Sequence, residues 1–163
     1  MKTLLVLRHA KSSWDDSRLD DHERPLNARG EADAPRMGEL VRDVGLMPDL
    51  VVSSDAVRAR LTAEAMAAAA GYPGTIQLEP RLYHANAAEI IDVLAGDLDG
   101  DEGTVMIVGH NPGVEELVTR LTGAREDMPT GALAQIALPI DRWSDLSPTT
   151  AGALEGLWRP KEI

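Results

Sequence analysis

Short apolar runs alternate along the chain with longer stretches in which apolar residues recur at helical spacing. Continuous runs rich in Leu, Val and Ile are typical of strands that are buried on both faces. Five runs have this character: TLLVLRH (3–9), DLVVSSD (49–55), GTIQLE (74–79), GTVMIVGHNPG (103–113) and GALAQIALP (131–139). The pattern therefore predicts a sheet of about five strands.

The stretches between these runs are amphipathic or rich in Ala, and they predict helices. In residues 27–45, Asn27 fits an N-cap and Gly45 a C-terminal end. Pro35 falls in the first half of this helix, and we expect it to kink the helix there. Further helices are predicted over residues 56–70, 87–98 and 114–123.

Strands that alternate with helices indicate βαβ units. We therefore expect a three-layer α/β/α sandwich around a mostly parallel sheet. A length of 163 residues matches one domain, and no internal repeat, low-complexity tract or linker divides the chain. Ligands of such sheets bind beyond the carboxyl ends of the strands, so reactive side chains are expected there.

Polar side chains follow three of the predicted strands. Arg8 and His9 end the first strand, residues 53–55 (Ser-Ser-Asp) end the second, and His110 follows the fourth. Arg58 lies in the first turn of the helix after the second strand. Because parallel strands bring their carboxyl ends to one edge, we expect both histidines and both arginines to share a site.

Two histidines and two arginines suggest phosphoryl transfer. Guanidinium groups bind phosphate oxygens with paired hydrogen bonds and stay charged. A neutral imidazole can attack phosphorus and carry the phosphoryl group as a labile N-phosphate. A second, protonated imidazole can stabilise the charge of the group in transfer. The helix N-terminus near Arg58 adds partial positive charge at an anion.

The charge balance narrows the set of partners. The chain has 27 acidic and 16 basic residues and a formal net charge of −11. This acidity argues against nucleic acid as a partner, because binding its backbone needs clustered Lys and Arg. A basic pocket in an acidic body would instead focus its field on a single phosphate.

The composition also bears on location. The chain has no cysteine, which excludes disulfides and thiolate chemistry and fits a reducing compartment. No apolar stretch of the sequence approaches the roughly 20 residues of a membrane span. We therefore expect a cytoplasmic protein without a membrane partner.

Several segments, in order along the chain, resemble the histidine phosphatase superfamily. LRHAKSSW (7–14) is similar to its Arg-His-Gly signature, with Ala10 in place of Gly as in the SixA-like branch. VVSSDAVRARLTAE (51–64) is similar to its Ser-Ser-x-x-x-Arg-Ala-x-x-Thr segment, and VMIVGHNPGVEEL (105–117) to its second-histidine segment. HERPLNARG and MPTGALAQI also resemble this branch. The resemblance implies a single histidine phosphatase domain over residues 1–163, with a phosphoglycerate mutase-like fold.

The resemblance also implies a role for each matched residue. His9 would be the nucleophile, and Arg8, Arg58 and His110 would bind the phosphoryl group and stabilise its transition state, with no metal or cofactor. The implied activity is a phosphatase acting on phosphohistidine in a protein or on small phosphomonoesters. Two alternatives stay open: a non-catalytic phospho-ligand binding module, and a phosphoglycerate mutase-type phosphotransferase.

The proton donor of many superfamily members has no clear counterpart. In QLEPRLYHANAAE the position of the acid is taken by Pro80, which argues against mutase activity. Glu79 is the candidate donor beside it, or else a solvated carboxylate. Lys11, Ser12 and His84 are candidates for substrate contacts. A metal is not expected, because the chain has neither a His-Glu-x-x-His motif nor any cysteine ligand.

Overall fold

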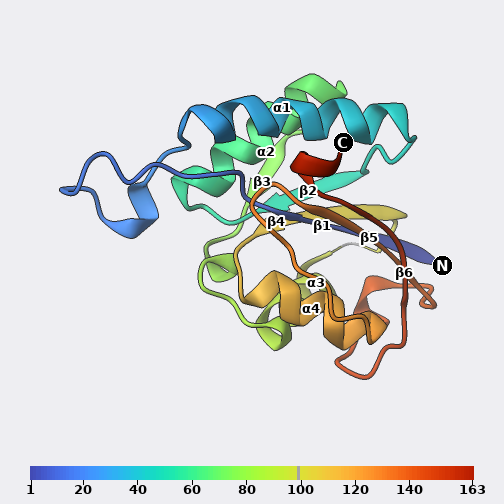
Figure 1. The fold of residues 1–163 in the computed structure, drawn as a ribbon. Helices are drawn as coiled ribbons and strands as arrows, with labels where there is room; N and C mark the ends of the chain where they lie inside the picture. Colours follow the sequence, from blue (N-terminus) through green and yellow to red (C-terminus); the bar gives the residue numbers. More distant parts are fainter. Residues whose placement is uncertain (99) are drawn as a thin grey trace.

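Six strands form one sheet in the computed structural model, which describes residues 1–98 and 100–163 (Figure 1). Their order across the sheet is β3-β2-β4-β1-β5-β6. The first four strands of this order are parallel, whereas β5 is antiparallel to both neighbours. The prediction of a mostly parallel sheet is therefore confirmed. The strands are β1 (Lys2–Arg8), β2 (Leu50–Ser53), β3 (Ile76–Leu78), β4 (Thr104–Gly109), β5 (Leu133–Leu138) and β6 (Ala153–Trp158).

Helices cover both faces of the sheet, which confirms the three-layer prediction. Figure 1 shows α1 (Ala28–Asp43) and α2 (Val57–Ala70) on one face, and α3 (Ala87–Asp97) and α4 (Gly113–Thr122) on the other. Alternate side chains of β1 serve the two layers, because successive residues of a strand point to opposite faces. Leu5 and Leu7 belong to the apolar core under α1 and α2. Leu4 and Val6 belong to the core under α3 and α4.

The helix ends follow the predicted signals. The Asn27 side chain accepts a hydrogen bond from the Gly30 N–H at 2.9 Å, so it is the N-cap of α1. This helix runs unbroken through Pro35 and ends at Asp43. Gly45 follows with a φ of +74°, a conformation that glycine adopts without strain. Within residues 1–98 and 100–163, none of the helices has the length and apolar character that crossing a membrane requires.

The sheet has one strand more than the five runs that the sequence analysis identified, and this additional strand is β6. β6 has the sequence ALEGLW, and Glu155 and Gly156 are residue types that disfavour strands. Its side chains are half-buried or exposed, because the strand lies at an edge of the sheet and pairs with β5 alone. The register of that pairing shifts between Gln135 and Ile136. An edge strand of this kind lacks the apolar run that identifies a buried strand.

Candidate active site

The register of the sheet brings the two histidines together. Arg8 and Gly109, the last residues of β1 and β4, are paired across the parallel ladder. His9 and His110 come directly after them, and their ring centroids are 5.1 Å apart. β2 lies on the other side of β4, and α2 begins just after β2, so Arg58 reaches the same edge.

A pocket of about 430 Å³ opens at this edge. Seven of the eight predicted site residues line it: Arg8, His9, Lys11, Ser12, Arg58, His84 and His110. Five further residues line the pocket that were not predicted as site residues: Trp14, Asp21, Arg24, Asn111 and Thr130.

The contacts of His9 leave one ring nitrogen available as a base. Its Nδ1 lies 2.8 Å from the carbonyl oxygen of Ala10. A carbonyl can only accept a hydrogen bond, so Nδ1 carries the proton and Nε2 keeps its lone pair. Burial lowers the pKa of His9 to about 4, with Arg58 and Arg8 contributing in the same direction against the opposing Ala10 hydrogen bond. His9 is therefore a neutral imidazole near pH 7 with a free Nε2.

A serine hydroxyl contacts the ring of His110. Its Nε2 lies 2.8 Å from the Ser54 hydroxyl oxygen, which also accepts a hydrogen bond from the Ala56 N–H. Burial, followed by the nearby His9 and Arg58, lowers the pKa of His110 to about 3, so this ring is also neutral near pH 7. When Ser54 donates its proton to Nε2, the proton of the neutral ring lies on Nδ1. Nδ1 is buried and has no hydrogen-bond partner in the described residues.

The two arginines have further donors without acceptors. Arg8 donates from Nη1 to the Met128 carbonyl at 3.0 Å, and Arg58 donates from Nη1 to the Asp21 carbonyl at 2.6 Å. The Nε atoms of both arginines are buried and lack partners within residues 1–98 and 100–163. Both arginines also line the pocket, so their guanidinium groups can donate hydrogen bonds to a bound oxyanion.

Asp21 supplies a carboxylate to the pocket. Its Oδ2 accepts hydrogen bonds from the Tyr83 hydroxyl at 2.6 Å and from Arg58 Nη2 at 3.0 Å. Arg24 donates from Nε to its Oδ1 at 3.2 Å. The hydrogen bond from Tyr83, followed by the contacts with Arg58, holds the pKa of Asp21 far below its usual range. Asp21 is therefore ionised and compensates part of the arginine charge.

Thr62 connects two of the segments that form the site. Its hydroxyl oxygen accepts a hydrogen bond from the Ala10 N–H at 2.9 Å and donates one to the Arg58 carbonyl at 2.7 Å. The threonine side chain is fully buried. The backbone beside His9 is therefore fixed relative to the first turn of α2.

The remaining candidates have different surroundings. Ser12 is buried and accepts a hydrogen bond from Arg24 Nη1 at 2.8 Å, whereas Lys11 is exposed at the pocket. His84 has a φ of +58°, in the left-handed region that is uncommon for a residue with a Cβ. Glu79 does not line the pocket. Its carboxylate accepts hydrogen bonds from the backbone and side chain of Arg81, which lower its pKa.

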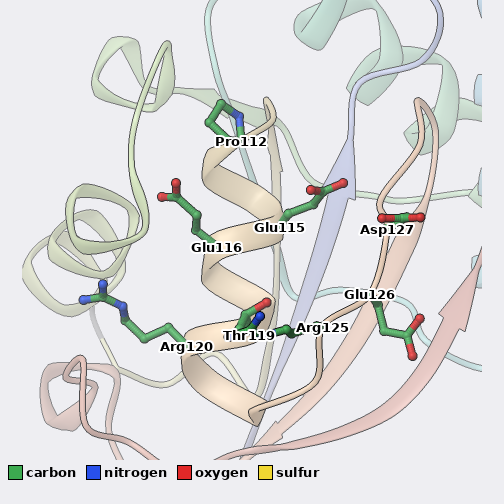
Figure 2. A pocket seen from close by; sticks show the side chains of 8 residues that line it. All are labelled: Pro112, Glu115, Glu116, Thr119, Arg120, Arg125, Glu126 and Asp127. Atoms are coloured by element: carbon green, nitrogen blue, oxygen red, sulfur yellow. The ribbon is translucent and has the colours of Figure 1, made fainter.

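A second hollow of about 490 Å³ lies along α4 (Figure 2). Glutamate, aspartate and arginine side chains surround it, together with Pro112 and Thr119. Neither histidine of the pair lines it, and Arg8 and Arg58 do not reach it. The candidate active site is therefore the smaller pocket at the strand ends.

Known sequences similar to this chain include members of a phosphatase family, in agreement with the geometry of the site. The family model of the histidine phosphatase superfamily (branch 1) matches residues 4–90. An uncharacterised chloroplastic protein of Arabidopsis thaliana is 35% identical over 170 residues, covering 98% of this chain and 78% of that protein.

Solved structures give the same assignment. The protein assigned as phosphohistidine phosphatase SixA of Nakamurella multipartitia has a TM-score of 0.84 and 27% identity, covering 98% of this chain and 96% of that chain. Its counterpart from Agrobacterium tumefaciens has a TM-score of 0.81 and 28% identity, covering 98% of both chains. The predicted phosphoglycerate mutase-like α/β fold is thus confirmed. The chain belongs to branch 1 of the histidine phosphatase superfamily, as an enzyme with phosphatase or phosphotransferase activity.

Proposed function

We propose that this enzyme hydrolyses phosphohistidine, carried by a protein, through a phosphorylated His9 intermediate. The observation that carries the proposal is the pair of histidines that line the pocket at the strand ends, with ring centroids 5.1 Å apart. His9 offers a free Nε2 lone pair, and His110, which contacts Ser54, lies beside it in the pocket. The resemblance to the two SixA structures supports the same substrate class.

The reaction has two displacements at phosphorus. In the first, Nε2 of His9 forms a bond to phosphorus, the bond between phosphorus and the substrate nitrogen breaks, and the departing imidazole takes a proton from water. In the second, a water molecule attacks the phosphorus of phospho-His9, and inorganic phosphate and free His9 result. Arg8, Arg58 and His110 stabilise the negative charge on the phosphoryl oxygens in both steps.

The choice of substrate follows from the protonation state of the acids near the pocket. Asp21 is the carboxyl group that lines the pocket in residues 1–98 and 100–163, and its depressed pKa keeps it ionised. Glu79 is held by Arg81 outside the pocket lining. General acid catalysis commonly contributes about 10²–10⁴-fold to a rate. An alkoxide leaves poorly without it, whereas the labile P–N bond of phosphohistidine breaks without a strong acid.

The test compares three substrate classes with chelator present. We expect turnover of a phosphohistidine peptide and of an aryl phosphate, and slow turnover of glycerol phosphate. The values of kcat/KM of Glu79→Gln for all three substrates should stay within about twofold of the wild-type values, because the Glu79 carboxylate is hydrogen-bonded to Arg81 outside the pocket. Equal rates for alkyl and aryl phosphates, lost in Glu79→Gln, would instead identify Glu79 as a proton donor.

A second measurement addresses the intermediate. Enzyme quenched with denaturant at alkaline pH during turnover should carry an acid-labile, base-stable phosphate, and His9→Ala should carry none and be inactive. If the wild-type enzyme bound vanadate but turned over none of the substrates, the protein would be a phospho-ligand binding module. Turnover that depends on added divalent metal would contradict a metal-independent mechanism.

A further inference from the structure

An exposed tryptophan lies at the mouth of the active-site pocket. Trp14 lines the pocket, yet its relative exposure is 73%. It belongs to the segment between β1 and α1, which extends away from the layered body in Figure 1. Single exposed apolar residues are common on protein surfaces and need no function. The contacts of Trp14 are what distinguish it.

The indole is held in place by a buried arginine. The Arg24 guanidinium carbon lies 3.5 Å from the centroid of the Trp14 ring, which is a close cation–π contact. Arg24 itself is only 7% exposed. It donates hydrogen bonds to the Ser12 hydroxyl at 2.8 Å and the Ser13 carbonyl at 3.1 Å, and it contacts the Asp21 carboxylate. The guanidinium therefore covers one face of the indole, and the indole remains largely exposed.

The base of the segment is fixed as well. Ser12 forms an antiparallel bridge with Leu26, and the Ser13 N–H donates to the Pro25 carbonyl at 2.8 Å. Trp14 comes directly after this bridge, so its backbone begins from a paired position. A rigid aromatic ring with one free face loses little conformational entropy when a ligand covers it.

We propose that the free face of Trp14 is a stacking surface for the planar ring that carries the phosphoryl group. With the phosphoryl group against the arginines and histidines of the pocket, the leaving group is directed toward the mouth, where Trp14 lies. The imidazole of phosphohistidine is such a ring, and an aryl phosphate presents the same chemistry. Trp14 is then a specificity residue that favours ring-bearing substrates over small aliphatic ones. This inference rests on the proposed function for the identity of the ring.

Binding of phosphonates tests the surface without any turnover. Phenylphosphonate and methylphosphonate share the anion and differ in the ring, and wild-type enzyme should bind the first about tenfold more tightly, as aromatic stacking and burial allow. Trp14→Ala should abolish this preference, and Trp14→Phe should keep most of it. Met47→Ala is the control, because Met47 is an exposed apolar side chain that does not line the pocket. It should leave the preference for phenylphosphonate over methylphosphonate unchanged. An unchanged preference in Trp14→Ala would overturn the proposal.

Turnover provides the second readout. Phosphoramidate and N-phosphoimidazole both contain a P–N bond, and only the second carries a ring. Trp14→Ala should lower kcat/KM for N-phosphoimidazole about tenfold, mainly by raising KM. Its kcat/KM for phosphoramidate should stay within about twofold of the wild-type value. Equal losses with both compounds would contradict a stacking role. If wild-type enzyme cleaved neither compound, the proposed function would fail, while the phosphonate preference would still decide the role of Trp14.

Discussion

At the scale of single residues, the site depends on keeping two imidazoles uncharged. Burial is the main cause of the low pKa values of His9, about 4, and His110, about 3. A charged His9 could not act as a nucleophile, because its Nε2 lone pair would be protonated. A bound phosphoryl group adds negative charge and favours the protonated form of His110, so the charge of that ring can appear when it is needed.

We therefore predict a characteristic pH dependence. In the unfolded chain a histidine has a pKa near 6.5, so between about pH 6.5 and 4 the unfolded state binds more protons than the folded state. The free energy of unfolding should fall as the pH is lowered through this window. NMR should find the rings of His9 and His110 still neutral at pH 5 and should find the His110 midpoint raised by saturating phosphate. A midpoint near 6.5 for either ring in the free enzyme would contradict the proposed state.

At the scale of elements, the nucleophile is supported by the first turn of α1. A Cβ atom on Gly30 would lie 2.1 Å from the Lys11 carbonyl oxygen, so the helix can approach the segment after His9 only with glycine at this position. The same segment is hydrogen-bonded to the helix N-cap, because the Asn27 N–H donates to the Lys11 carbonyl at 3.0 Å.

Gly30→Ala should therefore disturb both stability and catalysis. We expect a loss of about 1–3 kcal/mol in the free energy of unfolding, as for other overpacked sites, with a fall in kcat. Gly96→Ala is the matched control, because Gly96 also lies in a helix and its added Cβ would meet nothing within 4 Å. That control should be neutral or stabilising by up to about 1 kcal/mol. Urea denaturation and steady-state kinetics measure both effects, and equal behaviour of the two variants would refute the packing argument.

The position of each element in the fold decides whether the sequence could predict it. β1, β2 and β4 lie in the interior of the sheet, and their long apolar runs identified them directly. Asn27 and Gly45 marked the two ends of α1 because a cap and a left-handed glycine have local signatures. β6 could not be identified, because its stability comes from pairing with β5 and not from its own sequence.

At the scale of the whole molecule, residues from distant parts of the chain meet at one site. His9, Arg58 and His110 could be predicted because each follows a recognisable strand closely. Asp21 and Trp14 could not, because they lie in a segment without periodic pattern that reaches the pocket only by folding back. The sequence did carry a signal nearby, because LRHAKSSW ends with Trp14 and HERPLNARG begins directly after Asp21, and both resemble the SixA-like branch.

The position of β1 in the middle of the sheet determines when the site can form. β1 precedes the other strands along the chain, yet its two neighbours are β4 and β5, which come from the second half of the sequence. The Gly131 N–H, just before β5, contacts the carbonyl oxygens of Arg8 and His9 at 3.2 and 3.0 Å. Such non-local pairing forms late, because distant segments must meet first.

A chain that ends at Gly123 lacks β5 and β6 and should neither fold cooperatively nor bind phosphate, as measured by circular dichroism and calorimetry. Phosphate binding by this fragment would show that the pocket forms without them. Until β5 and β6 have been synthesised, a growing chain should therefore be unable to remove phosphoryl groups.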